Sequence, residues 1–122
     1  MKIYTSYYKH VSDNMRNLIP VRISTSVPSW FPWVCDELPE LYPGWGLVNG
    51  IKTGSIDWGE YTRIYKEHLS ALNRDVVLEK LKMMSQMQFN KDVVLLCYEN
   101  KDKPCHRHIV ADWLNCGVEE LE

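Results

Sequence analysis

Three residue types that can do chemistry stand side by side at Cys105, His106 and Arg107. The apolar spacing that follows them predicts that they open a helix. A helix N-terminus presents free N–H groups and partial positive charge, which favours a thiolate and attracts anions. Cys105 is therefore the predicted nucleophile, with His106 as a second catalytic residue and Glu99, after the preceding strand, as an acid or base.

Each of these residues also has a structural interpretation that the sequence leaves open. Cys105 could be a packed or capping thiol, and His106 lies at the edge of an apolar helix face, where hydrogen-bonded structural histidines are common. Arg107 and Glu99 could form only a clamp between strand and helix. Cys97 lies within an apolar run and is interpreted as an inert core residue.

A second group of residues is predicted to bind a ligand. Arg22 lies between Val21 and Ile23 in a predicted strand, so its side chain points to the opposite face and needs a partner, either Glu99 or a bound anion. We expect Arg22 and Arg107 to converge on one small anion. The other predicted ligand-binding residues are Ser24, Trp30 and Tyr61.

A metal site is the less favoured interpretation of the cysteine segment. Cys105 and His108 share a helix face, and Cys97 could approach them across the turn. No Cys-x-x-Cys pair is present, and a fourth ligand is not evident because Cys116 lies two to three turns away. We therefore predict no metal and no cofactor.

Strands and helices that alternate along the chain must position these residues. Apolar alternation or continuity predicts strands over residues 2–7, 19–24 and 93–98 and a short last strand over 118–121. Helical spacing predicts helices over residues 58–72, capped by Asp57, over 77–84, capped near Asn73 or Asp75, and from about Pro104 to Leu114.

The segments between these elements are predicted to be irregular. Residues 9–17 form a polar stretch. Prolines exclude a central strand over residues 27–33, which we expect to be a loop whose aromatic side chains pack on neighbouring parts of the protein. Prolines and glycines make residues 38–59 a long connection, which is either a functional lid or an insert without a role.

Together these elements predict one domain over residues 1–122, a three-layer α/β sandwich with a short, mostly parallel sheet and helices on both faces. In such sheets, ligands bind beyond the carboxyl ends of the strands. That rule brings residues 24–26, Glu99 and residues 105–107 to one edge.

Composition restricts the classes of function. The net charge of −2 provides no basic field for a long nucleic-acid duplex, and no apolar run is long enough to span a membrane. The beginning of the sequence does not resemble a signal peptide, so we expect reduced thiols and a cytoplasmic location. A homodimer is compatible with the sequence.

The C-terminal segment resembles a known family. Two segments are similar to the pattern that closes the domain of the domain-of-unknown-function 488 family. They are residues 95–99, Leu-Leu-Cys-Tyr-Glu, and, after a charged spacer, residues 105–114, Cys-His-Arg-His-Ile-Val-Ala-Asp-Trp-Leu. Residues 3–7 and 21–23 resemble its first two strands, and residues 61–72 its middle helix, in the compact variant of bacteria and their phages.

This resemblance implies an α/β fold and a shared pocket around Glu99, Cys105, His106 and Arg107, but it supplies no reaction. One departure concerns Pro20, because the second strand of the family usually carries an acidic residue at that position, two before the arginine. A role that needs that carboxylate has no counterpart in this chain.

Three functions from different classes remain open at this stage. The first is a small enzyme that acts on a nucleotide, nucleoside or similar anionic metabolite, held by Arg22 and Arg107. The second is a non-catalytic module that binds such a ligand, with the tryptophan-rich loop as a clamp. The third is a protein-interaction or regulatory factor of phage or bacterial origin, with Trp30 and Trp33 as anchors.

Overall fold

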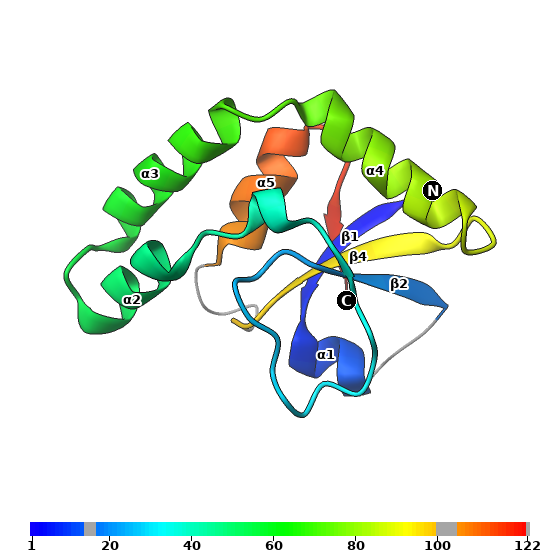
Figure 1. Ribbon diagram of the computed structural model, residues 1–122, viewed down its shortest axis with the longest axis horizontal. Helices are drawn as coiled ribbons and strands as arrows, with labels where there is room; N and C mark the ends of the chain where they lie inside the picture. Colours follow the sequence, from blue (N-terminus) through cyan, green and yellow to red (C-terminus); the bar gives the residue numbers. More distant parts are fainter. Residues whose placement is uncertain (14–16, 100–104, 122) are drawn as a thin grey trace.

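The computed structural model describes residues 1–13, 17–99 and 105–121. Within them, a five-stranded parallel sheet has the order β3-β2-β4-β1-β5 (Figure 1). The fourth strand lies at its centre and pairs with both β1 and β2. The predicted parallel α/β sheet is confirmed, and its strands are β1 (Ile3–Tyr7), β2 (Leu18–Arg22), β3 (Asp36–Glu37), β4 (Asp92–Cys97) and β5 (Glu119–Glu120).

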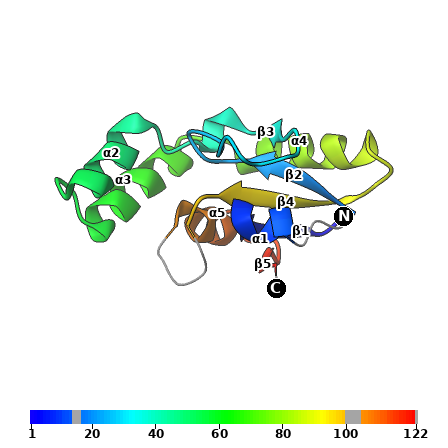
Figure 2. The same ribbon diagram turned by 90° about the horizontal axis from the view of Figure 1, so that it is seen from below.

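Helices cover both faces of this sheet, as predicted. On one face, α3 (Trp58–Ser70), α4 (Arg74–Gln86) and α5 (His106–Leu114) pack with Val93 and Leu95 into the larger apolar cluster. On the other face, α1 (Tyr8–Asp13) and the loop residue Phe31 pack on Val94 and Leu96. Figures 1 and 2 show α1 apart from α3 and α4, on the other side of the strands.

The central position of β4 in the sheet explains why its residues form the one continuously apolar run of the sequence. Residues Val93 to Cys97 of β4 are all buried, because this strand has a neighbour on each edge and side chains packed on each face. At the edge, β3 pairs with only Val21 and Arg22 of β2, so Pro20 lies where β2 has a single neighbour. This explains how a proline is accommodated in a strand.

The two predicted central helices have the predicted caps. The Asp57 side chain accepts a hydrogen bond from the Glu60 amide at 2.8 Å, and the Asn73 side chain accepts from the amides of Asp75 and Val76. Tyr61, Tyr65 and Leu69 form the buried face of α3. The aromatic spacing seen in the sequence therefore directs this helix onto the core.

Two helices were not predicted. The polar stretch after β1 contains α1, which is short and buries only Tyr8 and Val11. The predicted irregular connection contains the 3-10 turn η1 (Pro39–Leu41) and α2 (Trp45–Thr53). Gly44 and Gly54, which suggested a loop, bound α2 as its N-cap and its left-handed C-cap.

The remaining boundaries differ by a few residues from the predictions. The second strand ends at Arg22 rather than at residue 24, and the last strand is limited to Glu119 and Glu120. Residues 27–35 form the predicted loop without helix or strand. The part of the charged turn at 100–104, with Pro104 as a helix start, lies outside the described residues. Among the described residues, no helix combines the length and apolarity that crossing a bilayer requires.

The Asp57 cap gives a testable prediction, since it fixes the first turn of α3. Asp57→Ala should lower the free energy of unfolding by about 1 kcal/mol, because the Glu60 amide loses its acceptor. Asp57→Ser is the matched control and should retain most of the stability, since serine also caps helices. Urea denaturation measures both; equal losses in the two variants would contradict the capping role.

Candidate functional site

A pocket of about 550 Å³ opens beyond the carboxyl ends of β2 and β4. The loop after β2, the end of β4 and the N-terminus of α5 form its buried side, and α2 and α3 form its walls. This is the edge at which ligands bind in open parallel sheets. Five residues that the sequence analysis selected line the pocket: Ser24, Tyr61, Glu99, Cys105 and His106.

The pocket walls are largely apolar, and apart from Tyr61 they come from residues that were not predicted to bind a ligand. Trp45 and Lys52 belong to α2, and Trp58 of α3 stacks on Tyr61 with ring centroids 4.7 Å apart. Lys52 is the one lysine or arginine among the pocket-lining residues that the structure describes. The missed signal was the three-residue spacing of Trp45, Val48 and Ile51, which is typical of one helix face.

The two cysteines at this edge are joined to each other. Cys97, the last residue of β4, forms a disulfide with Cys105, the N-cap of α5. Both are buried and both line the pocket. This corrects two expectations, namely that the thiols are reduced and that Cys97 is inert core. Cys97 alternates with Val93 and Leu95, so its side chain points to the face of the sheet on which α5 packs.

His106 is buried and held in one orientation. Its Nε2–H donates to the backbone carbonyl of Ile23 at 2.7 Å, which leaves Nδ1 as an acceptor 3.7 Å from the sulfur of Cys105. Burial, and secondarily the charge of Arg107, lowers the pKa of His106 to about 4, against the raising effect of its bond to Ile23. The imidazole is therefore neutral near pH 7, with an unprotonated nitrogen directed at Cys105.

Arg107 is fully buried and contacts residues at the ends of β1, β4 and β5, together with the Glu99 backbone after β4. Its Nε and Nη2 donate to both carboxylate oxygens of Glu120 at 3.0–3.2 Å, and its Nη1 donates to the Cys97 sulfur at 3.1 Å and to the backbone carbonyl of Glu99. The guanidinium also lies 5.6 Å from the Tyr7 ring centroid. The predicted clamp therefore contacts the Glu99 backbone, and its carboxylate partner is Glu120, which the sequence analysis missed.

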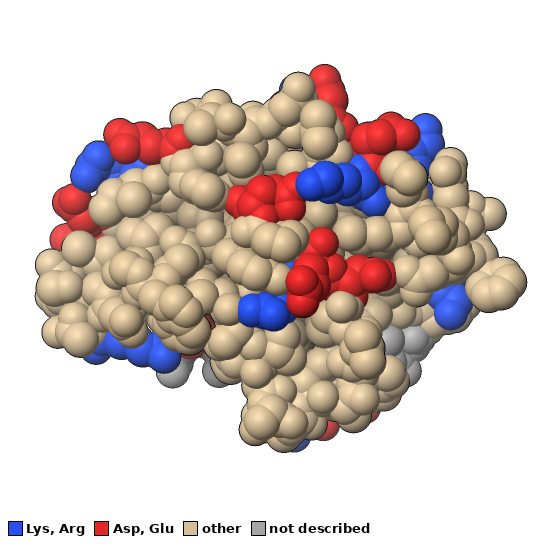
Figure 3. All heavy atoms as spheres, viewed as in Figure 1, with Lys and Arg blue, Asp and Glu red and all other residues tan. Residues whose placement is uncertain are grey.

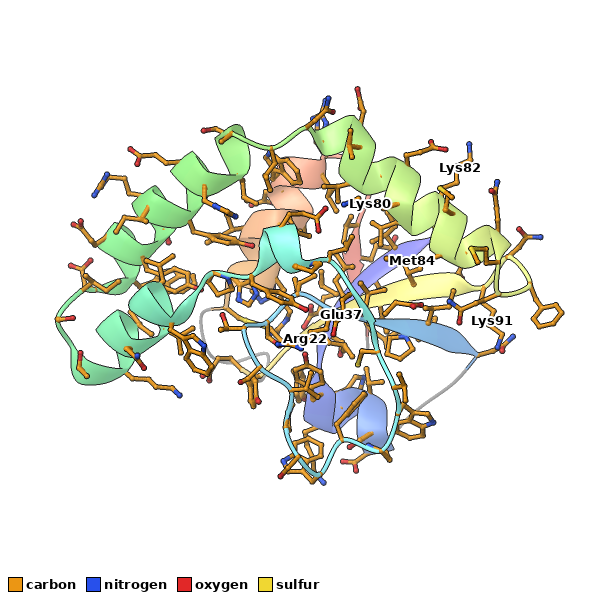
Figure 4. The ribbon with its side chains drawn as sticks, in the orientation of Figure 1. Arg22, Glu37, Lys80, Lys82, Met84 and Lys91 are labelled. Carbon is orange, nitrogen blue, oxygen red and sulfur yellow. A yellow bond between two sulfur atoms is a disulfide. The ribbon has the colours of Figure 1, made fainter. Side chains whose placement is uncertain are left out.

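Arg22 holds the loop after β2 instead of lining the pocket. Its guanidinium donates to the backbone carbonyls of Ser24 and Thr25 and forms an ion pair with Glu37 at 3.4 Å, toward which it points in Figure 4. Because Val21 and Ile23 belong to the larger cluster, Arg22 points to the opposite face from Arg107. The expected convergence of the two arginines on one anion is therefore wrong: each has its own carboxylate.

The other two predicted ligand-binding residues have different surroundings. The Ser24 hydroxyl donates to the Ser26 carbonyl and accepts from the Tyr8 hydroxyl, each at 2.6 Å, so it orders the pocket rim. Trp30 is 54% exposed, packs on Phe31 and lies outside the pocket. The tryptophans of this loop therefore do not line the described pocket and do not form the expected clamp over it.

Metal ligation would require the same buried residues. Among the described residues, one ligand atom from each of Cys97, Cys105 and His106 lies within 4.8 Å of the others. In the disulfide, the sulfurs are bonded to each other and are not thiolates, the form in which cysteine ligates zinc. His108, the alternative ligand, is exposed and lies outside this group.

The buried Arg107–Glu120 pair leads to a stability prediction. Glu120→Gln should lower the free energy of unfolding by about 2 kcal/mol, because it removes the charge that compensates a desolvated guanidinium. Glu119→Gln, next to it and exposed, is the matched control and should change stability by less than about 0.5 kcal/mol. Similar losses for both variants in urea denaturation would argue against the clamp.

Burial of neutral His106 predicts a loss of stability in acid. The unfolded imidazole titrates near 6.5 and the folded one near 4, so the unfolded chain binds the extra proton as pH falls through this window. The free energy of unfolding should be about 2 kcal/mol lower at pH 5 than at pH 7 from this group alone.

His106→Asn should reduce that difference when urea denaturation is compared at the two pH values. Partial desolvation also lowers the pKa of His108, so His108→Asn is the necessary control. It should have the smaller effect, because the His108 side chain is largely exposed to solvent, whereas His106 is buried. An unchanged pH dependence in His106→Asn would contradict the assignment.

Comparison with known proteins identifies the family. The family model DUF488-N3a, described as the active DUF488-N3 subclade, matches residues 3–117, a segment that contains every residue of the pocket. No curated protein and no solved structure matches the chain. With nearly its whole length covered by the family model, the chain belongs to the DUF488 family.

Proposed function

We propose that this protein is a small enzyme that acts on a nucleotide, nucleoside or similar anionic metabolite, with Cys105 in its reduced form as the nucleophile. The observation that carries the proposal is the fixed, neutral His106, whose Nδ1 lies 3.7 Å from the Cys105 sulfur at the buried side of the pocket. A cysteine beside an oriented imidazole acceptor is the arrangement that activates a thiol.

The shape and lining of the pocket support a ligand of this class. Its volume of about 550 Å³ suits a small metabolite. Trp45, Trp58 and Tyr61 offer aromatic surfaces to a flat ring such as a base. Lys52 supplies the positive charge for a phosphate or carboxylate, a role that the sequence analysis gave to Arg22 and Arg107.

The charge distribution favours a small ligand over a long duplex. On the face in Figure 3, acidic groups are interspersed with Lys and Arg, and broad areas carry neither. The net charge of the chain is −2. A duplex is held mainly by many phosphate contacts from a basic surface, whereas one anionic metabolite needs only a single cation.

The proposed reaction uses residues on the buried side of the pocket. The Cys105 sulfur attacks an electrophilic carbon of the metabolite, so a C–S bond forms while the bond from that carbon to its leaving group breaks. His106 Nδ1 accepts the thiol proton and passes it to the leaving group. Water then attacks the same carbon and releases Cys105. Glu99, at the pocket lining, is the second acid or base in this proposal.

A non-catalytic binding module is the second candidate, and the disulfide favours it. With its sulfur bonded to Cys97, Cys105 offers no nucleophile, yet the aromatic walls and Lys52 remain in place. A module of this kind would bind the same metabolites without converting them.

Turnover by the reduced protein tests the two candidates. Incubation with a panel of nucleotides and nucleosides under a thiol reductant, followed by chromatography, should show conversion of at least one compound. Cys105→Ser should abolish it, and His106→Asn should slow it by about 100-fold because the proton acceptor is lost. Cys116→Ser, at an exposed free cysteine outside the pocket, is the matched control and should retain full activity.

Two results would contradict this proposal. Conversion that persists in Cys105→Ser would show that Cys105 is not the nucleophile. Thermal stabilisation of the protein by a panel compound, without conversion and with loss in Trp58→Ala, would favour the binding module.

A further inference from the structure

Cys97 and Cys105 differ from the other cysteines of the chain in both position and partners. They are bonded to each other, whereas Cys35 and Cys116 are free. Both members of the pair line the pocket, so small oxidants and thiols have a route to the sulfurs although the side chains are buried. A structural disulfide within a closed core would have no such access.

Each sulfur also has its own polar neighbour that would support thiol chemistry after reduction. The Arg107 guanidinium donates to the Cys97 sulfur at 3.1 Å, which stabilises a thiolate at that position. On the other side, His106 Nδ1 faces the Cys105 sulfur at 3.7 Å, within hydrogen-bonding reach of the thiol that reduction would create there. Inert core cysteines have neither a cation nor a base beside the sulfur.

We propose that Cys97 and Cys105 form a redox-active pair, in which Cys105 is the cysteine that a peroxide oxidises and Cys97 is the resolving cysteine. The pair is thus a modification site whose oxidised state is the disulfide. The inference extends the proposed function, since oxidation would reversibly withdraw its nucleophile, but the cysteine chemistry itself requires no substrate.

The chemistry balances with a peroxide as the oxidant and a small thiol as the reductant. The Cys105 thiolate attacks a peroxide oxygen, so an S–O bond forms, the O–O bond breaks, and an alcohol or water leaves with the thiol proton. The Cys97 thiolate then attacks the resulting sulfenic acid, which forms the S–S bond and releases water. Two molecules of a small thiol return two electrons and two protons and leave as their own disulfide.

The test uses the full chain with Cys35→Ser and Cys116→Ser, so that only the pair remains. The reduced protein is exposed to one equivalent of hydrogen peroxide, alkylated and examined by intact mass. We expect two alkyl groups before oxidation, none afterwards with the loss of two hydrogens, and two again after dithiothreitol. Adding Cys97→Ser should stop the reaction at a sulfenic acid on Cys105, which dimedone traps.

A chain with Cys97→Ser and Cys105→Ser, which retains Cys35 and Cys116, is the reference for ordinary thiols. Oxidation of the pair should be at least about 10-fold faster than that of exposed Cys116 in this chain, because activated thiolates react faster. Circular dichroism verifies that each variant is folded.

Two outcomes would overturn the inference. In one, both thiols of the pair remain open to alkylation after oxidation. In the other, the reduced pair binds one zinc ion and resists peroxide, which would instead make Cys97, Cys105 and His106 a metal site. Because the mass measurement needs no substrate, an inactive enzyme with a reversible pair refutes only the proposed function, and an active enzyme without one refutes only this inference.

Discussion

The buried guanidinium of Arg107 is the interaction on which the arrangement of the site depends. A charge without solvent exposure is tolerated only when its donors are satisfied, and this one contacts the carboxylate of Glu120 in β5, the backbone of Glu99 and the sulfur of Cys97. It thereby joins the first turn of α5 to the ends of β4 and β5. Because His106 precedes Arg107, the same contacts anchor its backbone, while its own hydrogen bond to Ile23 orients the imidazole beside Cys105.

The two arginines also explain why the pocket is largely apolar rather than cationic. Arg107 is paired with Glu120 and Arg22 with Glu37, so neither needs a bound anion for its stability. Arg22 instead orders the pocket rim through the carbonyls of Ser24 and Thr25. In the proposed function, affinity for an anionic group would depend on Lys52 at the lining, and affinity for a ring would depend on the tryptophans.

The sequence predicted those parts of the fold whose signals are local. The apolar run of β4 and the capped periodicity of α3 and α4 identified the sheet and its main cover. In contrast, α2 was missed because its glycine caps resemble loop residues. At the site, the strand-end rule brought Ser24, Glu99, Cys105 and His106 together. The pairing of Arg107 with Glu120, in contrast, joins α5 to the strand that follows it through tertiary packing, which no local spacing encodes.

The site therefore combines two units with different physical origins. β4 and α5 supply both sulfurs, the imidazole and the guanidinium, so these groups are held by elements that pack in the core of the sheet. The wall from α2 contributes Trp45 and Lys52, which are not packed in that core. For the proposed function, changes in α2 would consequently alter ligand selection and leave the proposed sulfur chemistry intact, whereas changes at Arg107 would affect stability and chemistry together.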